Sequence, residues 1–389
     1  MMKKRVPLTG NAAAAEAMRQ INPDVVAAYP ITPQTEIMMT FAEFVADGLV
    51  DTELVTVESE HSAMSACVGA AAAGARVMTA TSAQGLALMH EVVYIASALR
   101  LPIVMCVVNR ALSAPINIHC DHADTMAERD SGWIQIYSET AQEVYDHTIL
   151  ALKLAEHEDV RLPVMVCQDG FITSHGVEPV EVLDDDVVKN FIGEFKPWYP
   201  LLDTDNPKTY GALDLFDYYF EHKRQQFEAM KNVPRVYEEA AKELSKITGR
   251  QYPKVEGFFL DDADYVIVVM SSTAGTTKYV VKEMRKEGKK VGLLKVRLYR
   301  PFPKEEIASL LDGRKAVAVL DRAYSIGAEA PLFCEIKSAL YDAKVKPQLA
   351  SYVYGLGGRD TPPSLIRSVF EDLISGNISK EEKYLGVRE

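Results

Sequence analysis

Short apolar runs alternate with helix-forming stretches through the first half of the chain. Each run is short enough for a strand, and most carry apolar side chains at successive positions, which is typical of strands buried on both faces. The runs lie at 24–29, 53–57, 76–81, 102–108 and 162–167, and the helical patterns lie at 35–48, 60–74, 85–99 and 141–158. This alternation predicts an α/β fold with a parallel sheet covered by helices on both sides.

The alternation stops near residue 190 and resumes in the last third of the chain. We expect a first α/β domain over 1–190 and a second α/β domain over 256–389. Between them, 191–255 carries many aromatic residues followed by a long charged helix. We interpret this segment as a connecting excursion that packs across a domain or subunit surface.

Charge and cysteine content exclude several classes of protein. The 42 basic and 55 acidic residues give a net charge of −13 without a dense basic cluster, so neither nucleic acid nor an anionic membrane is an expected partner. No apolar run approaches the roughly 18 residues of a membrane span, and the basic start lacks the apolar stretch of an export signal. Five scattered cysteines without a CxxC pair predict a cytoplasmic protein that holds no iron–sulfur cluster itself.

Polar residues follow the ends of the predicted strands in the first domain. In an open parallel sheet, ligands bind beyond the carboxyl ends of the strands. The residues at these positions are Thr32, Glu60, Ser82, Gln84, Asn109 and Arg110. Two hydroxyls, a carboxylate, two amides and a guanidinium on one edge indicate a site for a small anionic organic molecule.

Thr32 lies between Pro30 and Pro33, directly after an apolar run. Pro33 suits the first position of a helix and Thr32 can cap that helix, while Pro30 holds the preceding residue extended. A hydroxyl at the positive end of a helix favours an anion. The residues alone allow a purely structural cap equally well.

Glu60 and Arg110 each allow two interpretations. Glu60 lies in the first turn of a predicted helix that Ser59 caps, where a carboxylate complements the helix dipole. The stretch after it is almost uncharged, so the acid is poorly solvated and suited to proton exchange. Arg110 follows a buried strand, where its planar fork can clamp a carboxylate or form an internal salt bridge.

Three further motifs carry weaker signals. The HCDH stretch at 119–122 has no matching ligand pair elsewhere, so we expect no metal site on this chain. The glycine-rich stretches at 69–75 and 355–360 lack the context of a nucleotide-binding fingerprint, which disfavours a nicotinamide dehydrogenase.

Five long motifs, in order, resemble one family. These are AAYPITPQTEI, VESEHSAMSACVGAAAAGAR, TATSAQGLALMHE, NRALSAPINIHCDHADTMAERDSGW and DGFITSHGVEPVE, and GLLKVRLYRPFPKEEI and YGLGGRD extend the resemblance into the second half. They resemble the α subunit of the multi-subunit pyruvate:ferredoxin oxidoreductases (pyruvate synthases), within the 2-oxoacid:ferredoxin oxidoreductases. The resemblance implies a pyrimidine-type thiamine-diphosphate-binding domain followed by a domain similar to the carboxy-terminal domain of transketolases.

The resemblance also implies roles for individual residues. Thr32 and Arg110 are expected to bind the 2-oxoacid. Glu60 is expected to hydrogen-bond the aminopyrimidine ring of thiamine diphosphate, and the remaining cofactor contacts are expected from Pro30, Ile31, Ser82 and Gln84. The implied reaction is reversible oxidative decarboxylation of pyruvate, with the acyl group passed to coenzyme A and the electrons to ferredoxin.

The chain lacks parts that this chemistry needs. It has no GDG motif for magnesium and the cofactor's diphosphate, and no cluster-binding cysteines. The resemblance therefore implies that β, γ and δ subunits supply half of the cofactor site and all the iron–sulfur clusters.

Other functions remain open from the sequence. The same subunit could serve another 2-oxoacid, such as 2-oxoisovalerate or 2-oxoglutarate, or the chain could be a non-catalytic scaffold. We also expect an interface role for the second domain. Its stretch 297–303, RLYRPFP, is either a contact for coenzyme A or a neighbouring subunit, or a strand that leaves a sheet edge into a proline turn.

Overall fold

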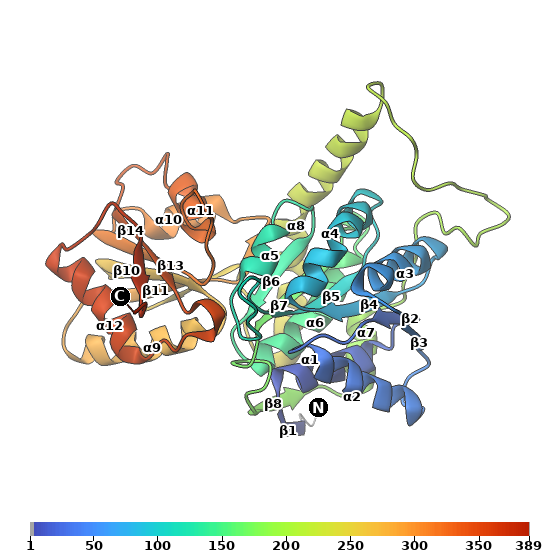
Figure 1. Ribbon diagram of the computed structural model, residues 1–389, viewed down its shortest axis with the longest axis horizontal. Helices are drawn as coiled ribbons and strands as arrows, with labels where there is room; N and C mark the ends of the chain where they lie inside the picture. Colours follow the sequence, from blue (N-terminus) through green and yellow to red (C-terminus); the bar gives the residue numbers. More distant parts are fainter. Residues whose placement is uncertain (1–3, 389) are drawn as a thin grey trace.

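The computed structural model describes residues 4–388 and contains two α/β units (Figure 1). The first unit is built on a seven-stranded sheet in the order β12-β6-β7-β5-β4-β2-β3. Its strands are β2 (Val25–Ala28), β3 (Glu53–Thr56), β4 (Val77–Thr81), β5 (Val104–Asn109), β6 (Ile134–Ser138), β7 (Val164–Asp169) and β12 (Leu298–Arg300). All neighbours are parallel except β12, which confirms the predicted parallel sheet. β6 has no counterpart among the predicted strands.

Helices cover both faces of this sheet. On one face lie α1 (Gly10–Ile21), α2 (Thr35–Ala46), α6 (Ala141–Ala155) and α7 (Asp185–Ile192). On the other lie α3 (Glu60–Ala73), α4 (Ala83–Ala98) and the short α5 (Ala123–Ala127). A separate antiparallel pair, β1 (Lys4–Leu8) and β8 (Glu178–Val182), lies beside α1.

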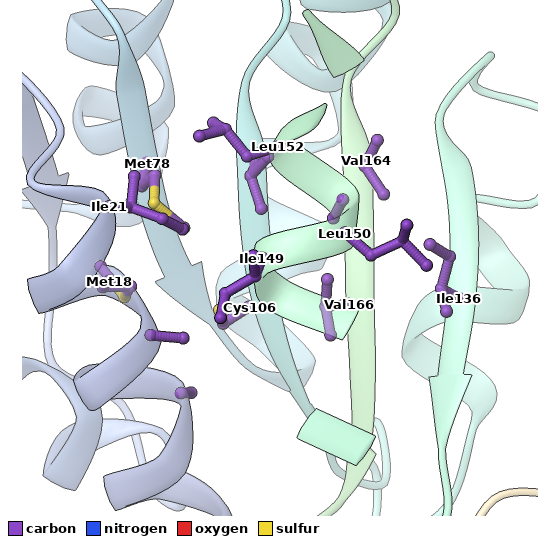
Figure 2. Packing of buried hydrophobic residues seen from close by; sticks show 14 of the residues in the cluster. Met18, Ile21, Met78, Cys106, Ile136, Ile149, Leu150, Leu152, Val164 and Val166 are labelled. Carbon is purple, nitrogen blue, oxygen red and sulfur yellow. The ribbon is translucent and has the colours of Figure 1, made fainter. Parts of the chain in front are cut away.

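The central strands are buried because both helical layers present apolar side chains to them. Figure 2 shows Met18 and Ile149, from α1 and α6, close to Cys106 and Val166 of the central strands. All four are at most 2% exposed. Burying such a side chain stabilises the fold by about 1.5–3 kcal/mol, so this layer holds the strand ends in fixed positions.

The second unit has a six-stranded sheet in the order β15-β14-β13-β10-β11-β9. Its strands are β9 (Val255–Phe258), β10 (Tyr265–Met270), β11 (Val291–Val296), β13 (Ala316–Asp321), β14 (Gln348–Tyr354) and β15 (Lys383–Leu385). Helices α9 (Thr273–Lys286) and α12 (Pro363–Ser375) cover one face, and α10 (Lys304–Leu311) and α11 (Pro331–Ala339) the other. Only β9 runs antiparallel to its neighbour.

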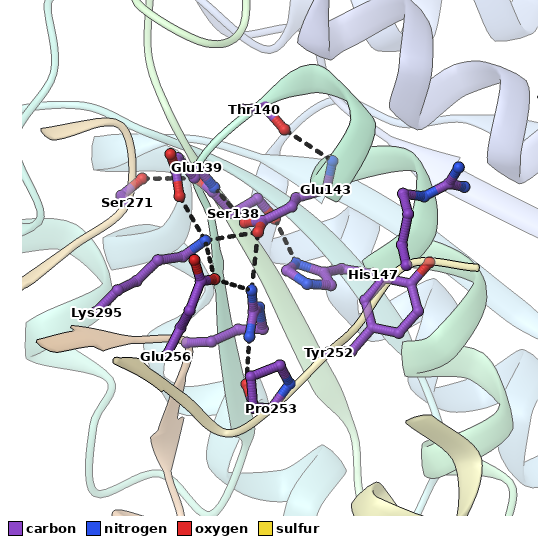
Figure 3. Close-up of polar contacts among 12 residues, drawn as sticks. Ser138, Glu139, Thr140, Glu143, His147, Tyr252, Pro253, Glu256, Ser271 and Lys295 are labelled. Carbon is purple, nitrogen blue, oxygen red and sulfur yellow. Dashed lines mark hydrogen bonds and ion pairs between the residues drawn. The ribbon is translucent and has the colours of Figure 1, made fainter. Parts of the chain in front are cut away.

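The two units share a strand and a buried ionic network. β12 belongs to the second half of the sequence but pairs antiparallel with β6 of the first sheet. Beside this pair, the Lys295 ammonium lies 2.6 Å from a carboxylate oxygen of both Glu139 and Glu143 (Figure 3). Arg297 bonds Glu143 and Glu256, each at 2.9 Å. The stretch 297–303 is thus a strand at a sheet edge, as one of its two interpretations held, and its first arginine is paired internally.

The segment after α7 leaves the body of the protein. Residues 193–218, here called the arm, lead into the long helix α8 (Tyr219–Thr248), whose second half packs on α6 while its start projects outward (Figure 1). Leu213, Phe216 and Phe220 are 91%, 94% and 73% exposed. The last residues of the arm and the start of α8 are therefore not covered by the rest of the described chain, whereas the first part of the arm packs on the body, where the N–H of Leu201 donates to the carbonyl of Ala72 at 2.9 Å.

Two negative findings concern the described residues. Over 4–388, no helix has both the length and the apolar character needed to cross a bilayer. The five cysteines are all free thiols, and only Cys334 is exposed.

Candidate active site

The structure places the predicted site residues beyond the carboxyl ends of four neighbouring strands. Thr32 follows β2, Glu60 follows β3, Ser82 and Gln84 follow β4, and Arg110 follows β5. We call this edge of the first sheet the rim. Because β5, β4, β2 and β3 are adjacent in the sheet, the five residues share one edge.

The turn that carries Thr32 differs from its predicted form. α2 begins at Thr35, and its cap position is Gln34, whose side chain makes no capping bond. The predicted cap by Thr32 is therefore wrong. Residues 31–34 form a turn of their own, in which the amide N–H of Gln34 donates to the carbonyl of Ile31 at 2.7 Å. The turn delays the helix and leaves Thr32 exposed at the rim, with Pro30 and Ile31 beside it.

Glu60 is a buried acid without a partner. The hydroxyl of Ser59 accepts from the N–H of Ser62 at 3.2 Å, which confirms the predicted cap of α3. Glu60 is only 7% exposed, and no side chain or backbone group within residues 4–388 hydrogen-bonds its carboxylate. A carboxylate on a largely buried side chain that has no partner within the protein is available to accept a donor group of a ligand.

The carboxylate of Glu60 lies against Gly85 in the first turn of α4. A Cβ atom at position 85 would be 2.8 Å from Oε1 of Glu60 and 2.5 Å from Oγ1 of Thr81. Only glycine permits this approach. Oγ1 of Thr81 and Oε1 of Gln84 are also buried without a hydrogen-bond partner. Three unpaired polar groups thus lie around the start of α4.

Ser82 contributes through its position in the fold. It is fully buried, and its hydroxyl donates to the carbonyl of Val108 at 2.5 Å. This bond ties the end of β4 to β5. The Ser82 hydroxyl is therefore already hydrogen-bonded within the protein, whereas Oε1 of Gln84 has no partner.

Arg110 joins the turn after β2 to the loop after β5. Its Nη1 donates to the carbonyl of Thr32 at 2.8 Å, and its Nε donates to the carbonyl of Asn117 at 2.9 Å. Burial lowers the pKa of this guanidinium, whereas the charge of Asp124 acts in the opposite direction. The structure thus brings two of the predicted residues, Thr32 and Arg110, into direct contact.

Asp124 organises the rim but was not predicted. Its carboxylate accepts from the backbone N–H groups of Ala83 and Arg110, both at 3.0 Å, and from the side-chain amide of Asn109 at 2.9 Å. Burial raises its pKa to about 6, and these hydrogen bonds oppose that rise. A single acid in the motif HADT therefore fixes the ends of both β4 and β5.

The second unit also reaches the rim, through its loop after β14. The side-chain amide of Asn117 donates to the carbonyl of Gly357 at 3.0 Å. Gly357 has a φ of 60°, and a Cβ there would lie 2.5 Å from Nδ2 of Asn117. The glycine-rich stretch predicted to have no nucleotide role thus supports the loop that holds Arg110.

The HCDH stretch lies at the junction of the two units. Cys120, His122 and Asp169 place possible ligand atoms within 4.8 Å of one another. Arg322 of the second unit bonds Asp169 at 2.9 Å and contacts the Cys120 sulfur at 3.8 Å. Burial alone would raise the pKa of Asp169, but Arg322 and His122 hold it far below its usual range. The guanidinium of Arg322 therefore supplies the positive charge that balances the Asp169 carboxylate in this cluster.

Asn11 is a further rim residue that was not predicted. Its side chain donates to the carbonyl of Pro33 at 2.8 Å and accepts from Gln168 at 3.2 Å. It is fully buried in the first turn of α1. A buried asparagine in an alanine-rich helix is the only local signal for it.

Together these features define an α/β protein in which polar side chains and an unpaired acid gather beyond the carboxyl ends of a parallel sheet. The family model for pyruvate flavodoxin/ferredoxin oxidoreductases, thiamine-diphosphate-binding, matches residues 16–242. The family model for core domain II of pyruvate:ferredoxin oxidoreductase matches residues 263–366. The chain belongs to the pyruvate:ferredoxin oxidoreductase family.

Individual relatives agree over the full length. The chain is 67% identical to the pyruvate synthase subunit PorA of Thermotoga maritima, with 99% of each chain covered. It is 52% identical to the PorA subunit of Methanocaldococcus jannaschii, with 93% of each covered. It is 46% identical to the ketoisovalerate oxidoreductase subunit VorA of Pyrococcus horikoshii, with 96% of each covered.

Two solved structures share the fold. The 2-oxoglutarate:ferredoxin oxidoreductase of Magnetococcus marinus, solved with 2-oxoglutarate, coenzyme A and succinyl-CoA, aligns with a TM-score of 0.75 at 21% identity, over 96% of this chain and 66% of that one. A split-gene transketolase, an inactive β4 tetramer, aligns with a TM-score of 0.56 at 10% identity, over 95% of this chain and 99% of that one. Both likenesses concern the fold alone.

Proposed function

We propose that this chain is the α subunit of a pyruvate synthase, which converts pyruvate and coenzyme A reversibly to acetyl-CoA and CO₂ with ferredoxin as electron carrier. The buried, unpaired carboxylate of Glu60 is the observation that carries this proposal. The 67% identity to a pyruvate synthase subunit favours pyruvate over the 2-oxoisovalerate implied by the 46% relative and over 2-oxoglutarate.

Glu60 is proposed to hold thiamine diphosphate by its aminopyrimidine ring. Bound thiamine diphosphate supplies an electron sink for decarboxylation of a 2-oxoacid. Glu60 would share a proton with a ring nitrogen, and its burial strengthens that contact because little water competes. The buried Oε1 of Gln84 offers an acceptor for the ring's amino group, and Pro30 and Ile31 line the same edge. Ser82 would act by holding the end of β4.

Thr32 and Arg110 are proposed to bind the carboxylate of the 2-oxoacid. Nη1 and Nε of Arg110 are bonded to backbone carbonyls, which fixes the plane of the guanidinium. Nη2 makes no hydrogen bond within residues 4–388. That donor and the exposed Thr32 hydroxyl can together orient the substrate, and a well-oriented reactant accounts for much of a catalytic rate.

Other subunits are proposed to complete the enzyme. The names of the relatives describe subunits, so the chain works in a complex. The sequence has no GDG motif and no CxxC pair. We therefore assign magnesium and diphosphate binding to a β subunit and the iron–sulfur clusters to further partners, the γ and δ subunits, in the cytoplasm.

Glu60→Gln tests the proposal in the assembled enzyme. Glutamine preserves size but cannot share the proton in the same way, so we expect turnover to fall by about 10²–10⁴-fold, the usual contribution of proton transfer. Pyruvate-dependent reduction of ferredoxin measures it. Glu58→Gln is the matched control, because Glu58 is an exposed acid two residues away.

The two variants also separate an enzyme from a scaffold. Gel filtration with the partner subunits should show that both assemble normally. A scaffold would keep the activity of the complex with either substitution, and that result would contradict the proposal.

A further inference from the structure

A pocket lies at the amino ends of the strands of the first sheet, opposite to the rim. It has a volume of about 570 Å³ and forms where the arm folds back on the body. Its walls include Arg100, just before β5, Arg161, just before β7, and the arm residues Trp198 and Lys208. Since these arginines precede β5 and β7, whereas the rim residues lie beyond the carboxyl ends of strands in the same parallel sheet, this arm pocket is separate from the candidate active site.

Every charged residue that lines the arm pocket is basic. These are Arg100, Arg161 and Lys208, in a chain whose net charge is −13. Within residues 4–388, no carboxylate lies within 4.0 Å of any of the three. Among the acids that act on Arg161, Glu156 has the largest electrostatic effect. Its carboxylate, however, pairs with Arg76 at 2.7 Å.

The two arginines are also poorly solvated. Arg161 is only 5% exposed, and its Nε is buried without a hydrogen-bond partner. Burial lowers the pKa of both guanidinium groups, and the charge of Arg161 lowers that of Arg100 further. Glu156 and Glu158 act on Arg161 only from beyond ion-pair distance, so two adjacent, desolvated cations remain that attract an anion.

Both arginines adopt a backbone conformation that favours glycine. The φ angle is 59° at Arg100 and 45° at Arg161. Arg100 directly follows the end of α4, a position that glycine commonly occupies. The left-handed conformation costs a residue other than glycine about 1–2 kcal/mol. Hydrogen bonds from both side chains to backbone carbonyls offset this strain in part, but they leave the Nε of Arg161 without a partner.

Aromatic rings complete the pocket. The guanidinium groups of Arg100 and Arg161 lie 5.8 and 5.6 Å from the ring centre of Trp198, and the Lys208 ammonium lies 5.3 Å from that of Tyr199. Stacking explains how the cations are oriented but leaves their charge unbalanced. Cations that converge beside aromatic faces, in a volume within the usual range of about 300–1,000 Å³, suit a small aromatic anion.

We propose that the arm pocket binds a small organic anion in which an aromatic ring is joined to phosphate, as in a nucleotide. The phosphates would balance Arg100, Arg161 and Lys208, and the ring would lie against the arm aromatics. This inference is independent of the proposed function, because it concerns the amino ends of the strands.

Titration of the assembled enzyme with ADP tests this assignment, with adenosine and pyrophosphate as separate probes of ring and charge. Trp198 supplies a local signal, since it is 46% exposed while the only other tryptophan, Trp133, is fully buried. The signal is the fluorescence difference from the Trp198→Phe enzyme. We expect ADP to bind at least tenfold more tightly than either fragment.

Three variants distinguish the pocket from a non-specific effect. Arg161→Gln should weaken ADP binding by at least tenfold, and Lys208→Gln by about threefold. Lys380→Gln, a change to an exposed cation far along the chain, should leave it unchanged. If Arg161→Gln does not assemble, the exposed Lys208 variant alone decides.

Several results would overturn the assignment. They are an unchanged Trp198 signal with ADP, adenosine binding as tightly as ADP, or ADP affinity unaffected by Lys208→Gln. An arm pocket already filled by a neighbouring subunit would give the first of these results.

Discussion

Arg110 shows how one side chain can serve both the fold and a ligand. Two of its side-chain nitrogens hold backbone carbonyls of separate loops, while the third remains for a ligand within the described chain. A lysine has a single ammonium and cannot meet these demands together. The planar fork, rather than the charge alone, is therefore the property that matters at this position.

Arg110→Lys should raise the KM for pyruvate by about 10–100-fold, the cost of a lost charge-assisted hydrogen bond. The change in kcat should be smaller. Steady-state kinetics of the assembled enzyme measure both. Arg314→Lys is the control, because Arg314 also donates to backbone carbonyls but lies in the second unit. An unchanged KM in Arg110→Lys would exclude Arg110 as the carboxylate ligand.

The position of single residues at the rim was predictable where each directly follows a strand. Thr32, Glu60 and Arg110 were found because each follows a recognisable strand, and topology then gathers the strand ends. Asp124 escaped this reasoning, since it acts on the backbone of Ala83 and Arg110, which are distant in sequence. The cap assigned to Thr32 failed because a separate turn intervenes before α2.

At the scale of elements, the loop after β14 connects the second unit to the rim by a hydrogen bond. Its Gly357 accepts from Asn117, whose own carbonyl accepts from Arg110. A chain of two hydrogen bonds thus connects one unit to the guanidinium of the other. The positive φ and the close approach of Asn117 both require glycine.

Gly357→Ala should displace Asn117 and thereby loosen Arg110. We expect a rise of several-fold in the KM for pyruvate, together with about 1–2 kcal/mol of backbone strain. Gly376→Ala serves as the control, because Gly376 also has a positive φ, but a Cβ added there would meet no atom within 4 Å among the described residues. Equal effects of the two substitutions on KM would show that strain alone, and not Asn117, is responsible.

Helices and strands were predictable where the hydrophobic pattern of a short stretch defines them. The strands and helices from 24 to 108 appear within a few residues of their predicted ranges. The pairing of β12 with the first sheet could not be foreseen, because this strand has only three residues and its partner lies about 160 residues earlier. No local periodicity reports such a long-range pairing.

A network of buried charges lies between the two units, beside the shared strand β12. His147 lies beside this network, and its Nδ1 is 2.9 Å from the Ser138 hydroxyl (Figure 3). Burial lowers the pKa of His147 to about 3, with Arg297 and Lys295 contributing and Glu143 opposing. The ring is therefore neutral in the fold at pH values where it would be protonated in the unfolded chain.

This difference predicts a pH dependence of stability. Between pH 6.5 and about 3 the unfolded chain binds a proton at His147 that the fold excludes, so stability falls as the pH falls, by up to about 1.4 kcal/mol per unit. His147→Asn, which can keep the bond to Ser138, should flatten this slope in urea unfolding at pH 5–7. Parallel slopes for both proteins would contradict the assignment.

The exposed apolar side chains near the end of the arm affect how long a lone copy of this chain survives in a cell. Leu213 and Phe216 of the arm, and Phe220 at the start of α8, would remain in water in a lone copy, and uncovered apolar surface promotes aggregation and proteolysis. We therefore expect surplus copies to be short-lived. Matched synthesis of the whole set of polypeptides, rather than of this one alone, should set its abundance.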